Sequence, residues 1–129
     1  MARILMLGGD HDLVEAGRTI LVGAGYTVAM AHDIPDALAL RDHFQPDLVF
    51  IDVTGHDLSD AADLSARTRA GGVHSPILII GTKGRTVEFF TYDGDGAIVP
   101  APDFPEKPMQ PAALLKNVRY ELEQAAAGG

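Results

Sequence analysis

The sequence predicts an α/β domain in which a parallel β-sheet lies between two layers of helices. Short apolar runs alternate with amphipathic helical stretches along the 129 residues, and this alternation requires parallel strands joined by right-handed crossovers. The runs at residues 48–51 and 77–80 are continuous and apolar, as is usual for central strands buried on both faces. The length suits one domain with a real core, so residues 1–129 are expected to form a single domain.

Strands and helices are expected to alternate along the chain. The strands are expected at residues 4–7, 26–31, 46–52, 76–80 and 97–99, and the helices at residues 13–24, 33–45, 58–70, 86–92 and from 111 onward. Asp33 can cap the second helix and Pro35 suits its first turn, while Gly25 ends the helix before it. Residues 125–129 are expected to form a flexible tail.

The composition excludes several classes of partner. Ten basic residues stand against 18 acidic ones, for a formal net charge of −8, which argues against nucleic acid or an anionic membrane because both need a basic face. The chain contains no cysteine, so it has no disulfide or thiol chemistry. No apolar run approaches the roughly 20 residues of a membrane span. We therefore expect a cytoplasmic domain whose partner is a protein surface or a divalent cation.

Polar residues gather where the strands are expected to end. Asp52 closes the central apolar strand, and in open α/β sheets this carboxyl edge is where ligands bind. The other residues expected along this edge are Asp10, His11, Asp12, Thr54, His56, Asp57, Gly81, Thr82, Lys83 and Lys107. Carboxylates beside a lysine suit a phosphoryl acceptor or a site for a hard cation. The alternative is that Asp52 only caps the loop that follows it.

Four segments together carry a family pattern. They are residues 46–52 (Pro-Asp-Leu-Val-Phe-Ile-Asp), residues 76–80 (Pro-Ile-Leu-Ile-Ile), residues 107–115 (beginning Lys-Pro) and residues 25–28 (Gly-Tyr-Thr-Val). In order and spacing they resemble the receiver domain of response regulators in two-component signalling, over nearly the whole chain. The resemblance implies a flavodoxin-like fold, with a five-stranded parallel sheet in the order 2-1-3-4-5 and helices on both faces.

The resemblance also implies roles for particular residues. Asp52 would be the phospho-acceptor, and Lys107 would pair with the phosphate across a site that binds Mg²⁺. The backbone carbonyl of Thr54 would be a metal ligand, and the peptide bond from Lys107 to Pro108 would be cis. The partner would be a histidine kinase or a downstream signalling protein, and a homodimer through the last helix is possible.

The chain departs from the family pattern at four positions. Gly8 and Gly9 replace the acidic pair that follows the first strand, and Asp10 falls one place later. Gly81 replaces the hydroxyl residue after the fourth strand, and Ala97 aligns with the aromatic switch residue of the fifth. Since Mg²⁺ depends on one or two carboxylates near the acceptor, we expect weak or absent binding, by Asp52 with the help of Asp10 and Thr54.

Two hypotheses for a signalling module follow, neither of them an enzyme. In the first, the chain is an atypical receiver whose signalling depends little or not at all on phosphorylation. It would then bind proteins through the last helix, the neighbouring strand and the short helix at residues 86–92. In the second, it is a slow but working receiver in a phosphorelay, which uses Asp52 with Asp10 as the only acidic helper.

A further alternative is a metal- or cofactor-binding domain on a similar fold. Asp10, His11, Asp12, His56 and Asp57 combine imidazole with carboxylate, as transition-metal sites do. A phosphate-binding loop is disfavoured because the two glycines after the first strand lack a third at the required spacing.

Overall fold

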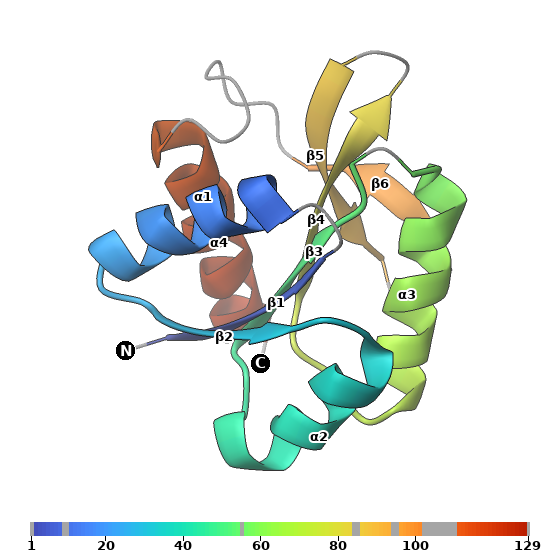
Figure 1. Cartoon of the computed structure of the whole chain (residues 1–129), viewed down its shortest axis with the longest axis horizontal. Coiled ribbons are helices and arrows are strands. Elements are labelled where there is room, and N and C mark those ends of the chain that lie inside the picture. The colour runs from blue at the N-terminus through green and yellow to red at the C-terminus, as the bar shows by residue number, and fades with distance from the viewer. Residues whose placement is uncertain are drawn as a thin grey trace.

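The computed structural model describes residues 2–8, 11–54, 56–83, 86–93, 96–101 and 111–128. The elements, labelled in Figure 1, are β1 (Arg3–Gly8), α1 (His11–Gly23), β2 (Thr27–Ala31), α2 (Ile34–Phe44), β3 (Leu48–Asp52), α3 (Leu58–Ala70), β4 (Ile77–Lys83), β5 (Thr86–Tyr92), β6 (Ile98–Pro100) and α4 (Pro111–Gly128). Among these residues, no helix combines the length and apolar character that crossing a bilayer requires.

One mixed sheet forms the centre of the molecule, with the strand order β2-β1-β3-β4-β5-β6. The pairs β1–β2, β1–β3 and β3–β4 are parallel, as predicted. β5 pairs antiparallel with β4, and β6 pairs antiparallel with β5. The predicted class and the order of the first four strands are therefore confirmed, and the remaining strands differ from the prediction.

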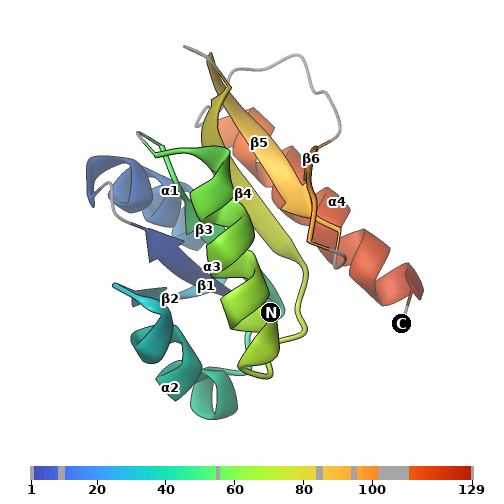
Figure 2. The ribbon, with the colours of Figure 1, turned by 90° about the vertical axis from the view of Figure 1, so that its right-hand side faces the viewer.

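Helices cover both faces of the sheet. In Figure 1, α1 and α4 lie on one side of the strands and α2 and α3 on the other, and Figure 2 shows α3 in front of the sheet with α4 behind it. Side chains alternate along each strand between two apolar clusters. Ile4 and Met6 of β1 join the cluster beneath α1 and α4, whereas Leu5 and Leu7 join the cluster beneath α2 and α3.

The residues predicted to begin or end helices α1 and α2 are found at those helix ends. Asp33 is the N-cap of α2, and its side chain accepts a hydrogen bond from the backbone N–H of Asp36 at 2.9 Å. Pro35 lies in the first turn of the same helix. Gly25, which follows α1, has a φ of 97°, a conformation that favours glycine. α4 continues to Gly128, and the flexible tail at residues 125–129 stays a prediction.

The short helix predicted at residues 86–92 is wrong, because this segment is the strand β5. Its sequence, Thr-Val-Glu-Phe-Phe-Thr-Tyr, is rich in β-branched and aromatic residues, which favour strands. β4 also continues through Gly81 and Thr82 to Lys83, where an exit loop was expected, and the two strands form a hairpin. The strand predicted at residues 97–99 is β6, which is antiparallel to β5 and not parallel.

Adjacent phenylalanines explain why an extended backbone is favoured here. Phe90 is 2% exposed and joins the cluster beneath α2 and α3, while Phe89 joins the cluster beneath α1 and α4. The Phe89 ring meets that of Phe50 edge to face, with 6.5 Å between the ring centroids. Neighbouring side chains can fill clusters on opposite faces of a sheet only in a strand.

Truncation of either phenylalanine tests this arrangement. We expect Phe89→Ala and Phe90→Ala each to lower the free energy of unfolding by about 3–5 kcal/mol, since each leaves a cavity in a different cluster. Urea denaturation measures the loss, and Thr86→Ala, at an exposed position of the same strand, is the matched control. Equal stability of the Phe89 variant and the Thr86 variant would contradict the assignment of residues 86–92 to the sheet.

The half-buried Glu121 of α4 leads us to predict that the stability of the fold depends on pH. Burial raises the pKa of this carboxyl above its ordinary value of 4.5. The folded state therefore binds the proton more tightly than the unfolded state, and stability falls as pH rises above about 4.5. We expect Glu121→Gln to raise the melting temperature at pH 7, and the gain to disappear by about pH 4. An unchanged melting temperature at pH 7 would contradict this account.

Candidate functional site

Asp52 lies where β1 and β3 end side by side, next to β4, which continues beyond them. It is the last residue of β3, and its backbone is in register with Gly8 of β1 on one side and Ile80 of β4 on the other. The residue is only 4% exposed. Asp52 thus lies at the carboxyl end of β3, where the sequence predicted it.

The loop after β3 holds the Asp52 carboxylate in place. Its Oδ1 accepts two hydrogen bonds from Thr54, one from the backbone N–H at 2.9 Å and one from the hydroxyl at 2.7 Å. A side chain that bonds the backbone two residues on is the Asx-turn pattern expected of aspartate in a turn. The loop-capping interpretation of Asp52 therefore describes a real contact, and it is compatible with a second, chemical role for the residue. The predicted role of the Thr54 carbonyl as a metal ligand stays a prediction.

Gly8 is closed to side chains in this conformation. A Cβ built on it would lie 2.7 Å from Cγ2 of Val14 and 2.8 Å from Cβ of Asp52. Both distances are well below van der Waals contact, and both neighbours belong to buried residues that cannot easily move aside. The position where the resemblance places an acidic residue therefore lacks a carboxylate and also lacks the room for one.

Gly81 is similarly crowded. A Cβ there would lie 3.0 Å from Cδ2 of Leu58 and 3.0 Å from Cγ2 of Val53. Gly81 lies within β4, opposite Glu88 of β5, and not in a loop. Apolar side chains thus pack over the position at which the resemblance places a hydroxyl.

A cleft of about 390 Å³ begins at Asp52 and extends between α2 and α3. Leu7, Gly8 and Asp52 come from the strand ends, and Ile34 and Pro35 come from the start of α2. Residues of α3 and of the loop before it complete the lining, namely Val53, His56, Asp60, Asp63, Leu64 and Arg67.

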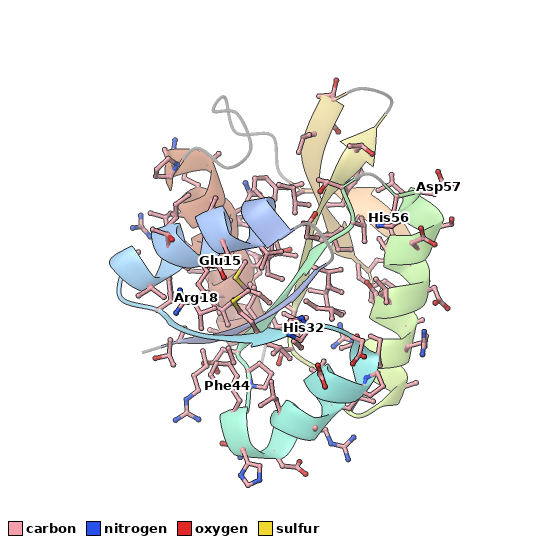
Figure 3. All side chains as sticks on the ribbon, viewed as in Figure 1. Glu15, Arg18, His32, Phe44, His56 and Asp57 are labelled. Carbon is pink, nitrogen blue, oxygen red and sulfur yellow. The ribbon has the colours of Figure 1, made fainter. Side chains whose placement is uncertain are left out.

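Two histidines line this cleft, His32 directly after β2 and His56 shortly before α3. Figure 3 labels both side chains. The Nδ1 atom of His56 lies 3.9 Å from Oδ2 of Asp60, and Nη1 of Arg67 lies 3.7 Å from Oδ2 of Asp63. This cleft could not be predicted from the sequence, because its walls depend on the spacing between two helices. Arg67 lines the cleft although its side chain is 57% exposed.

Several predicted site residues lie outside the described residues. These are Gly9, Asp10 and Lys107, together with the peptide bond from Lys107 to Pro108. Their predicted roles stay predictions. Ala97, predicted within the fifth strand, lies just before β6 in an exposed turn, where its N–H donates to Oδ1 of Asp93 at 3.1 Å.

The described part of the site fits Mg²⁺ poorly. It supplies one buried carboxylate, that of Asp52, and the space beside Gly8 excludes another. Mg²⁺ in proteins is held by one or two carboxylates together with several waters and substrate phosphates. The single carboxylate of Asp52 is therefore the smallest number that such a site uses. For the alternative transition-metal site, the described residues contain no group of three histidines, cysteines or carboxylates able to hold an ion. His56 faces Asp60, and Asp57 precedes α3 without capping it through its side chain. The side chains of Asp10, His11 and Asp12 lie outside the described part of the chain, so this alternative stays a prediction.

Known proteins similar to this chain include a response regulator and a transcriptional regulatory protein of bacteria. The chain is 30% identical over 131 residues to the response regulator MprA of Mycobacterium ulcerans and 29% identical over 125 residues to the transcriptional regulatory protein DltR of Streptococcus agalactiae. These alignments cover 96% of this chain but 54% and 53% of the relatives, so the chain spans about half the length of the curated relatives it matches. No family model matches the sequence.

Solved structures give the same picture of the fold. A CheY-like receiver domain protein from Methanospirillum hungatei aligns with a TM-score of 0.65 at 18% identity, over 100% of this chain and 99% of that one. NtrX from Brucella abortus aligns with a TM-score of 0.70 at 24% identity, over 99% of this chain and 28% of that one. The chain is thus similar in sequence to response regulators, and its fold is the CheY-like fold of receiver domains.

Proposed function

We propose that this chain is a receiver domain of two-component signalling, and that it works as a protein-interaction module that depends weakly or not at all on phosphorylation of Asp52. The observation that carries the proposal is the closed space beside Gly8, where a Cβ would lie 2.8 Å from Cβ of Asp52. A histidine kinase or a downstream signalling protein is the partner that the similarity to response regulators supports.

The chemistry of acyl phosphate formation explains why this space matters. A carboxylate oxygen of Asp52 would attack the phosphorus of a phosphodonor, and the donor would leave with the electrons of its bond to phosphorus. Negative charge on the transferring oxygens must be offset by a cation held close to the acceptor. The loss of several kcal/mol of such stabilisation slows the reaction by about 10³-fold or more. Without an acidic residue at Gly8, and without room for one, that cation is held poorly.

The interaction surface differs from the one predicted from sequence. That surface included a helix at residues 86–92, and this segment is instead the strand β5, paired with β4 and β6. A partner that docks beside α4 would therefore meet antiparallel strands where a helix was expected.

Exposure to a small phosphodonor tests the proposal. We expect the protein, incubated with acetyl phosphate and Mg²⁺, to gain no phosphoryl group or only a trace, because the cation at Asp52 is held poorly. Intact-mass spectrometry measures the adduct, and Asp52→Asn is the control for phosphorylation elsewhere. Stoichiometric phosphorylation that disappears in the Asp52→Asn variant would overturn the proposal. It would favour the slow working receiver, in which Asp10→Asn should then abolish the adduct.

A pair of glycine substitutions tests the closed space directly. We expect Gly8→Ala to lower the free energy of unfolding by about 1–3 kcal/mol, since the new methyl group overpacks the contact with Val14 and Asp52. Gly23→Ala in α1 is the matched control, because nothing lies within 4 Å of a Cβ there, and it should be neutral or slightly stabilising. Urea denaturation compares the two. If Gly8→Ala is as stable as Gly23→Ala, the position has room for a side chain and the steric argument fails.

A further inference from the structure

The cleft between α2 and α3 has the size and lining of a small-molecule site. Its volume of about 390 Å³ lies within the range of roughly 300–1,000 Å³ typical of such sites. Ile34 and Pro35 of α2 and Leu64 of α3 give the lining an apolar part on each helix, where a flat apolar body could lie. Few but convergent polar groups with apolar walls are the usual composition of a pocket that binds a ligand.

The charge along this cleft selects the class of ligand. Its lining contains the carboxylates of Asp33, Asp52, Asp60 and Asp63, against the single guanidinium of Arg67. Asp60 and Asp63 project from α3 at the rim, with side chains 58% and 66% exposed. Their ion pairs with His56 and Arg67 are long, at 3.9 and 3.7 Å, and exposed pairs of this kind contribute little. An incoming cation can therefore compete for these two carboxylates.

We propose that the α2–α3 cleft binds a small organic cation, a flat apolar body carrying an amine, amidine or guanidine group. The body lies between Pro35 and Leu64, and the charged group contacts Asp60 and Asp63 at the rim. Asp52 lies at the inner end of the same cleft, so an occupant would cover the approach to this carboxylate from the α2–α3 side. The proposal does not depend on phosphorylation, and it stands or falls separately from the proposed function.

A titration with three probes of one shape tests the charge preference. Benzamidinium, benzyl alcohol and benzoate share a phenyl ring and differ in charge. Followed by the backbone amide signals of the ¹⁵N-labelled protein, benzamidinium should bind about tenfold more tightly than benzoate, and added salt should weaken it. The shifted signals should belong to the end of β2, the start of α2 and the first turns of α3. Equal affinities for the two ions, or shifts confined to α1 and α4, would overturn the proposal.

A matched pair of variants tests the residues. Asp60→Asn with Asp63→Asn removes both rim charges at exposed positions, where the fold tolerates change. We expect this variant to bind benzamidinium only as well as benzyl alcohol. Asp42→Asn, on α2 outside the cleft with a side chain 87% exposed, changes the net charge without touching the site and should bind as the parent does. Unchanged binding of benzamidinium by the double variant would overturn the assignment.

Discussion

The close contact between the ends of β1 and β3 is the constraint on which the site depends. Gly8, Val14 and Asp52 meet so tightly that no Cβ fits at the glycine. This contact lets α1 pack against the strand ends and keeps Asp52 almost wholly buried. Because Thr54 donates twice to the same carboxylate oxygen, the aspartate is held by its own loop. The space beside Gly8 that a side chain would need is therefore taken by Val14 and Asp52.

The same principle of close packing explains the second glycine. Val53 and Leu58 occupy the space beside Gly81 that a hydroxyl side chain would need. At both glycines the neighbouring side chains leave little room for a Cβ, as expected for interiors that are close-packed.

The parts of the fold that sequence could predict are those specified by local pattern. Continuous apolar runs identified β3 and β4, and the capping aspartate and the proline marked α2, as found. Residues 86–92 were misassigned because a seven-residue apolar segment does not distinguish a short helix from a strand by periodicity alone. Pairing with β4 decided the outcome. At the site, Asp52 and the substitution of Gly8 were predictable from position, whereas the steric closure and the α2–α3 cleft depend on tertiary distances.

The parallel strands pair with residues that are distant in sequence, whereas the antiparallel strands after β4 pair with residues close by. Ile4 pairs with Leu48 across two helices and a strand, whereas Lys83 pairs with Thr86, only three residues further along the chain. Closing a long loop costs more entropy than closing a short one, and it slows folding. The hairpin of β4 and β5 can therefore form early and locally. The pairing of the parallel strands, among them β3 with Asp52, is then the slow step of folding.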